Sequence, residues 1–461
     1  MLATERFASP EPPRYGRAVS DYKQTGRLGR LVKLGGLAAN VAGNSVARRL
    51  GGLLKSDEER AESVRDGLIE SAQKVVRTMG EMKGAAMKVG QMLSVAPEAL
   101  PREFLEQLKA LQKDSPAMSY EMVAAEFNKS TGRSIPDAFR TFDPTPLGAA
   151  SIGQVHRART FDGQDVVVKI QYPGIADTLD SDLKNLGSAL QVARVVADKQ
   201  HLDGLLAEIR AGILEEADYR QEAENLRKYG AILRQHPQIV VPEVLPELSS
   251  ERALTMSYVP GEKLDVALDK MTDPAQKNRA AFAFSETIIW MFHHQGVLHA
   301  DPHPGNFLLT PEGKFGFLDF GCFREYEAEF CDGWLDLLVA KWEKQPWRLR
   351  EIHHRLGFRA MGGSEGPSSE QLDQLLELAL EPFMEDREFD WGEWQPHKTL
   401  EKFMRNNLGI IRFPAPPRAV FYFRVCAGIW GFLQRLKARG NWYRLAQETA
   451  RQRGRLGAPV A

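Results

Sequence analysis

The residues His299-Ala-Asp-Pro-His-Pro-Gly-Asn306 and the Asp319-Phe320-Gly321 that follows have types and spacing suited to phosphoryl transfer. The transition state of that reaction spreads negative charge, which metal ions and positioned polar groups stabilise. Asp301 is predicted to orient the attacking hydroxyl or water. Asn306 and Asp319 are predicted to ligate Mg²⁺, which prefers hard oxygen ligands. The pattern is typical of the catalytic half of a protein-kinase-like ATP site.

The alternative is a polar turn with incidental acidic residues, and the order and spacing of the three groups argue against it. Two features of ordinary protein kinases are missing. Ala300 replaces the arginine that would bind a phosphorylated activation loop, and no Ala-Pro-Glu follows Gly321. A platform for peptide substrates is therefore not expected.

The second half of an ATP site is predicted from a strand-rich stretch upstream. Strands are expected over 139–142, 154–160 and 165–170, with Asp162-Gly163 as a hairpin turn between the last two. Lys169, among apolar neighbours, is predicted to hold the α- and β-phosphates. The connection between the first two strands is predicted to cover the phosphates with backbone N–H groups, so small residues are needed there. Its cofactor-binding residues are Gly148, Ala149, Ala150, Ser151, Ile152 and Gly153.

A glutamate is needed to orient Lys169, and the helical acidic stretch 214–225 offers four. Spacing alone does not choose between Glu215, Glu216, Glu222 and Glu224. The strand expected over 253–259 leads to a Pro-Gly hinge, and its Met256 and Tyr258 are predicted to contact the cofactor. Beyond Gly321, helices are expected over 325–342, 347–356, 369–383, 398–407 and 418–439.

The last of these helices carries Phe421, Val425, Ile429 and Leu433 at a spacing that favours core packing over membrane contact. The longest apolar window, 419–433, is interrupted by Arg424, so the chain is not expected to span a membrane. Near the N-terminus, helices with recurring glycines are expected over 56–93. From spacing alone, Lys88 and Gln91 form an ordinary polar pair there.

Composition is that of a globular protein, with 43% hydrophobic and 26% charged residues and a net charge of −1. No nucleic-acid partner is implied. Residues 1–55 carry ten Lys or Arg against three acids, and residues 405–455 carry eleven against one. Taken alone, these basic ends could contact anionic lipid or nucleic acid, or be solvated surface charge. The three cysteines are too few for a disulfide framework, and no signal peptide is apparent, so a cytoplasmic location is expected.

The predicted organisation has five parts and an α+β fold. They are a disordered N-terminus over 1–25, a helical extension over 26–137, a kinase-like N-lobe over 138–260, a helical C-lobe over 261–440 and a basic tail over 441–461.

With these residues in place, the chain resembles the UbiB/AarF family of atypical kinase-like proteins over roughly residues 26–440. The family's Lys-x-Gly-Gln signature appears as Lys88-Val-Gly-Gln91, its alanine-rich loop as Gly148-Ala-Ala-Ser-Ile-Gly-Gln-Val155, and its Glu-x-Asp signature as Glu216-Ala-Asp218. The resemblance assigns the pairing with Lys169 to Glu222.

The resemblance implies an atypical kinase-like two-lobed fold, ATP and Mg²⁺ as cofactors, and a role in ubiquinone (coenzyme Q) biosynthesis. It also implies that Lys88, Gln91, Glu216 and Asp218 meet and gate the site, which excludes phosphorylation of other proteins. Expected partners are a lipid or quinone-precursor molecule, quinone-biosynthesis enzymes and, peripherally, the anionic inner membrane. Two alternatives stay open: a small-molecule kinase, and a nucleotide-gated scaffold with negligible chemistry.

Overall fold

The computed structural model describes residues 118–150, 152–174, 217–360, 366–407 and 413–457, with residues 210, 214 and 410. Lys88, Gln91, Ser151 and Glu216 lie outside the described residues, as do segment 1–25 and most of 26–137. The described residues fall into two compact units, whose boundary crosses helix α5 (Tyr120–Thr131) and strands β3 (Gly153–Arg159) and β4 (Asp165–Gln171). The lobe boundaries given above remain predictions.

The first unit contains a tight hairpin in which strand β2 (Gly148–Ala150) pairs with the start of β3 in antiparallel register, Gly148 opposite Val155. Ile152 at the turn is fully buried, and its carbonyl accepts a hydrogen bond from the Tyr172 amide at 2.9 Å. A Cβ on Gly153 would stand 2.2 Å from the Ile170 carbonyl oxygen. Close approach of two strands therefore requires glycine at this position.

The second unit begins with the remaining sheet, in the strand order β1-β3-β4-β6. Strand β1 is Thr141–Phe142 and β6 is Ala253–Ser257. Val166, Val167 and Val168 on β4 are all buried, which is the pattern of a strand covered on both faces. The expected strand over 139–142 is shorter than predicted, because Phe139 ends the short helix α6 (Ile135–Ala138).

The rest of the second unit consists of helices linked by short strands. A four-stranded sheet has the order β5-β10-β9-β7, and β8 pairs with β11. In chain order, the helices and strands of this part of the second unit are α9 (Tyr219–Leu233), β5 (Ile239–Val240), β7 (Glu262–Lys263), α10 (Leu264–Lys270), α11 (Pro274–Gln295), β8 (Val297–His299), β9 (Phe307–Leu309), β10 (Phe315–Phe317), β11 (Phe323–Glu325), α12 (Ala328–Trp342), α13 (Leu349–Leu356), α14 (Ser369–Ala379), β12 (Phe389–Asp390), α15 (Pro396–Asn406), α17 (Ala419–Leu436), β13 (Arg439–Gly440) and α18 (Trp442–Gln452).

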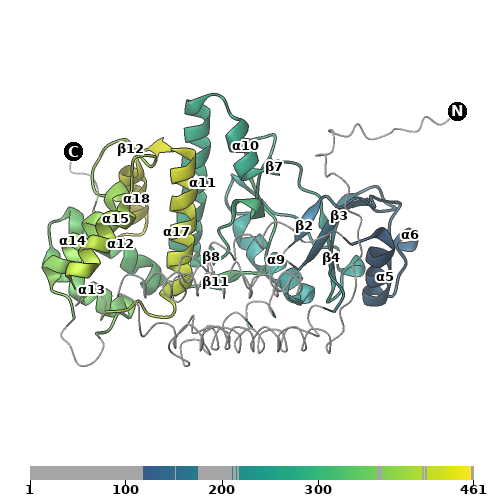
Figure 1. Cartoon of the computed structure of the whole chain (residues 1–461), viewed down its shortest axis with the longest axis horizontal. Helices are drawn as coiled ribbons and strands as arrows, with labels where there is room; N and C mark the ends of the chain where they lie inside the picture. Colours follow the sequence, from purple (N-terminus) through teal and green to yellow (C-terminus); the bar gives the residue numbers. More distant parts are fainter. Residues whose placement is uncertain are drawn as a thin grey trace, which may run out of the picture. The chain divides into compact units, whose positions relative to one another are not determined.

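Helix α11 is the longest of the described elements, and its ends follow from its sequence. Asp273 caps its N-terminus by accepting from the Ala275 amide, and Gly296 ends it in the left-handed region with φ 65°. Helix α17 runs alongside it (Figure 1). Val425, Ile429 and Leu433 of α17 are buried, which confirms the predicted core stripe for these three residues, whereas Phe421 is only half-buried. Among the described residues, no helix combines the length and apolar character needed to cross a membrane.

Several predicted helix boundaries were wrong: the helix expected to end at residue 383 ends at Ala379, and two further boundaries are displaced by strand pairing. The helix expected from residue 325 starts at Ala328, because Phe323–Glu325 pairs with β8 as a strand. The helix expected to continue to residue 439 ends at Leu436, where Lys437 adopts φ 51°. Backbone pairing with distant strands overrode the helical pattern at both places.

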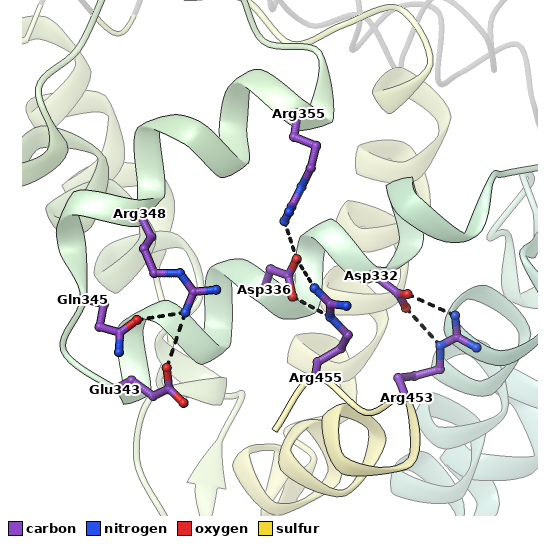
Figure 2. A network of polar contacts seen from close by, with 8 residues as sticks. All are labelled: Asp332, Asp336, Glu343, Gln345, Arg348, Arg355, Arg453 and Arg455. Atoms are coloured by element: carbon purple, nitrogen blue, oxygen red, sulfur yellow. Dashed lines mark hydrogen bonds and ion pairs between the residues drawn. The ribbon is translucent and has the colours of Figure 1, made fainter. Parts of the chain in front are cut away.

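The segment 441–461, predicted as a basic tail, folds as helix α18 over Trp442–Gln452. Trp442, Ala446 and Ala450 are buried, and Ala450 packs with Leu335 and Val339 of α12. Two arginines that follow α18 also bind acids of α12 (Figure 2). Arg453 contacts Asp332 at 2.9 and 3.2 Å, and Arg455 contacts both carboxylate oxygens of Asp336 at 2.7 Å. The tail prediction was wrong because these acids are more than 100 residues away in sequence and spacing does not reveal them.

Ion pairs with acids of the fold offset much of the basic charge of residues 405–455. Besides Arg453 and Arg455, several arginines there form ion pairs with acids of the fold: Arg424 with Asp301, Arg435 with Asp269, Arg439 with Asp390, Arg444 with Asp386 and Arg451 with Glu448. Charge neutralised inside the molecule is a weak attractant for lipid. Contact of this region with anionic lipid stays a prediction.

Asp336 is the centre of the network in Figure 2 and should matter for stability. This buried carboxylate binds both Arg355 and Arg455. Asp336→Asn is expected to lower the free energy of unfolding by about 2 kcal/mol, the usual size for a hydrogen bond to a charged group. The midpoint of urea unfolding measures this. Asp386→Asn, whose partner Arg444 is 73% exposed, is the matched control and should leave the midpoint nearly unchanged. Equal midpoints for wild type and Asp336→Asn would contradict the prediction.

Candidate nucleotide and phosphoryl-transfer site

Lys169 and Glu222 form a buried ion pair at the centre of the second unit. Lys169 Nζ donates to Glu222 Oε1 at 2.9 Å and Oε2 at 2.7 Å, and the two side chains are 5% and 1% exposed. Helix α9 supplies Glu222 one turn after its N-cap, where Asp218 accepts from the Arg220 amide. The pairing predicted for these two residues is present. The exposed Glu224 does not share it, because it lies on the opposite face of the helix.

Asp319 is the third charged member of this group. Its Oδ2 lies 3.9 Å from Lys169 Nζ, and its Oδ1 accepts from the Gly321 amide at 2.8 Å. Burial disfavours the charged form of Lys169, but the carboxylates of Glu222 and Asp319 outweigh it and raise the pKa of Lys169 well above its usual value. Lys169 therefore remains a cation, as a phosphate ligand must.

Helix α9 also fixes the Asp-Phe-Gly segment. Glu222 Oε1 accepts from the Phe320 amide at 3.4 Å, and Asn225 Nδ2 donates to the Phe320 carbonyl at 2.9 Å. The buried ring of Phe320 stacks on Phe323 at 5.1 Å, and Phe323 stacks on Tyr229 of α9 at 4.5 Å. The glutamate that orients Lys169 and the segment that carries Asp319 are thus held by the same helix.

His299 links the segments that carry Asp301 and Asp319, a role that the sequence did not reveal. Its Nε2 donates to the Asp319 carbonyl at 2.8 Å, and its Nδ1 accepts from the Asp301 amide at 3.3 Å. A single neutral tautomer, protonated at Nε2, satisfies both bonds. Pairing of β8 with β11, with His299 opposite Phe323, places the ring between them.

Both oxygens of the Asp301 carboxylate are engaged. Asn306 Nδ2 donates to Oδ2 at 3.0 Å, and Arg424 Nη2 donates to Oδ1 at 3.0 Å. Arg424 comes from helix α17 and was missed as a site residue. The signal was its position, because it is the one charged residue in the apolar window 419–433.

The donor set suits a magnesium ion held mainly by phosphates. The amide nitrogen of Asn306 is used by Asp301, which leaves its oxygen as the atom able to bind a cation, and Asp319 contributes a carboxylate. These are hard oxygen ligands, and Mg²⁺ usually takes only one or two from the protein. Among the described residues, no group of three or more His, Cys, Asp or Glu could hold a metal. Such a cluster is not needed for a cation that the phosphates also bind.

The remaining predicted residues have varied surroundings. Met256 is buried on β6, and Tyr258 has the guanidinium of Arg157 4.4 Å from its ring centroid. In the first unit, Gly148, Ala149 and Ala150 form strand β2. Ile152 lies in the turn that follows, and Gly153 begins β3. Because the Ile152 side chain is buried, only backbone atoms of that residue could meet a ligand. Cofactor binding by all of these residues stays a prediction, as does gating by Asp218.

Comparison with known proteins identifies the family. The sequence profile of the ABC1 atypical kinase-like domain matches residues 110–353. "Atypical kinase COQ8, mitochondrial" of Saccharomyces cerevisiae is 30% identical over 437 residues, which cover 92% of this chain and 85% of the yeast protein. "Atypical kinase coq-8, mitochondrial" of Caenorhabditis elegans is 31% identical over 345 residues, covering 72% of this chain and 45% of the worm protein. The chain thus spans less than half of that relative.

A solved structure supports the same conclusion. The complex of Rv3197 with erythromycin from Mycobacterium tuberculosis matches with a TM-score of 0.58 and 29% identity, over 86% of this chain and 98% of that one. The α+β kinase-like fold expected from the sequence is confirmed. The resemblance to UbiB/AarF proteins is confirmed as well, and this chain belongs to the ABC1 family of atypical kinase-like proteins.

Proposed function

We propose that this protein binds Mg²⁺–ATP and hydrolyses it, or transfers its γ-phosphate to a small molecule, in support of ubiquinone biosynthesis at a membrane surface. The observation that carries the proposal is the buried ion pair of Lys169 and Glu222 beside Asp319. Packing of an apolar core does not require such a pair. A buried ion pair is weak evidence for stability, since desolvation offsets much of its attraction. Its retention next to Asp319 is understandable if Lys169 serves an anionic ligand.

Each residue has a role that its contacts support. Lys169, oriented by Glu222, would hold the α- and β-phosphates, and Asn306 and Asp319 would hold the metal. Bound Mg²⁺–ATP would supply the phosphoryl group and the positive charge that stabilises its transfer. Asp301 would orient the attacking water or hydroxyl, with His299 fixing its backbone relative to Asp319. Asp301 is already held by hydrogen bonds from Asn306 and Arg424, so little reorganisation is needed.

The biological setting rests on the relatives. The yeast and worm proteins are named as mitochondrial atypical kinases of the COQ8 type, and the UbiB/AarF resemblance implies quinone biosynthesis. A quinone precursor or lipid, and the enzymes that modify it, are the proposed partners. The proposed contact with anionic lipid is through the basic segment 1–55, because many arginines of residues 405–455 are paired within the fold.

ATP turnover by the purified full chain tests the proposal. It is measured alone, with anionic liposomes and with a small phenol that mimics a quinone precursor, beside Asp301→Asn. Turnover that requires Mg²⁺ and falls roughly 100-fold or more in the variant would support the proposal. Stoichiometric phosphorylation of the phenol would favour the small-molecule kinase. Tight Mg²⁺–ATP binding without turnover would favour the scaffold, and failure to bind nucleotide would overturn the proposal.

A further inference from the structure

Helix α17 packs directly on the loop that carries Asp301. Arg424 reaches Asp301 Oδ1 at 3.0 Å, with the two side chains 10% and 18% exposed. One turn further along the same face is Gly428, where a Cβ would stand 2.3 Å from Pro302 Cγ. A larger residue at this position would push the helix away from the loop. The glycine therefore allows the close packing that brings Arg424 to Asp301.

The loop has no cation of its own beside Asp301. Residues 299–306 contain neither lysine nor arginine, so the positive charge comes from a residue 123 positions later in the chain. Among the described residues, Asn306 also donates to this carboxylate, and Asn306 has a proposed role at the metal as well. Arg424 has no such second role. Its charged contact is therefore dedicated to holding the carboxylate of Asp301.

We propose that Arg424 is a positioning residue for phosphoryl transfer, which fixes the carboxylate of Asp301 toward the attacking group and balances its charge. This inference rests on the proposed function. Arg424 acts through Asp301, so its loss should lower kcat while leaving the binding of Mg²⁺–ATP largely intact. A planar guanidinium presents several N–H groups in a fixed geometry, whereas a lysine supplies only a mobile point charge.

The experiment compares Arg424→Gln, Arg424→Lys and Arg424→Ala with wild type in full-length protein. The Gln variant is expected to lose roughly 100-fold in kcat, as for a misplaced catalytic group, with KM for ATP changed by less than about threefold. The Lys variant should lie between Gln and wild type, and added guanidinium should restore part of the activity of the Ala variant. Arg435→Gln is the matched control, because Arg435 lies on the same helix and its pair with Asp269 is about half exposed. Its turnover should equal that of wild type.

A double variant separates positioning from a general structural effect. If Arg424 works through Asp301, then adding Arg424→Gln to Asp301→Asn should lower kcat no further. Losses that multiply in the double variant would overturn the inference, as would an Arg424→Gln enzyme within about threefold of wild type. Failure of the proposed function is a distinct result: wild type itself would then show no turnover, and the inference would fall with it.

Discussion

Asp319→Asn is expected to lower Mg²⁺-dependent ATP turnover by roughly 10²–10³-fold, the range for losing one group that stabilises transition-state charge. The carboxylate is one of the proposed ligands of the metal, and an amide binds Mg²⁺ more weakly because it carries no charge. The fold should be retained. Asp319 Oδ1 accepts a hydrogen bond from the Gly321 amide at 2.8 Å, and an amide oxygen can accept the same bond.

Two measurements check this expectation. Steady-state turnover gives the loss in rate, and calorimetric titration with ATP, with and without Mg²⁺, gives the loss in metal-dependent affinity. Asp162→Asn is a suitable control, because Asn-Gly is as favourable as Asp-Gly in the hairpin turn that Asp162 occupies. An Asp319→Asn protein with wild-type affinity and turnover would remove Asp319 from the site and with it the proposed metal position.

Glu222→Gln is expected to affect stability and activity together. Lys169 would keep its charge in a buried position, where Asp319, at 3.9 Å, is the one carboxylate left near it among the described residues. Loss of one partner of a buried ion pair costs about 3–5 kcal/mol, because the other charge stays buried without compensation. Turnover should fall roughly 100-fold, since Lys169 and the Phe320 backbone both lose a contact that orients them.

Glu224→Gln is the control for this variant, since Glu224 is an exposed glutamate on the same helix. Its unfolding midpoint and its turnover should match those of wild type. Bound Mg²⁺–ATP should recover part of the stability of Glu222→Gln, because a ligand that binds only the folded state stabilises it. If Glu222→Gln and wild type have the same unfolding midpoint, the ion pair of Lys169 and Glu222 does not contribute the expected free energy of unfolding.

Lys169 and Asp301 are held by opposite kinds of neighbour. The carboxylate of Glu222, from helix α9, pairs with the ammonium group of Lys169. The guanidinium of Arg424, from helix α17, pairs with the carboxylate of Asp301. The two helices thus set the charge of the two groups proposed to act on the nucleotide. Asn225 and Phe320 connect α9 to the segment that carries Asp319, so a shift of α9 would displace Lys169 and Asp319 together.

Short-range patterns predicted much of this protein. Asp301, Asn306 and Asp319 were found by spacing along one loop and the next strand, and Lys169 by its apolar strand. Helices α12 and α13 end at the predicted residues, and α17 lies in a region predicted to be helical. Such features depend on periodicity and on residues close in sequence, which a single chain displays directly.

The pairings between distant residues were decided by tertiary structure alone. Spacing left four glutamates equal as partners of Lys169, and only the rotation and packing of α9 bring Glu222 to it. Arg424 reaches Asp301 because α17 packs on the catalytic loop, and Arg453 and Arg455 reach α12 because α18 does. The sequence by itself predicted the residues proposed to carry out the chemistry and indicated the family to which the protein belongs. Which charge neutralises which was set by packing, because an ion pair depends on distance in space and not on separation along the chain.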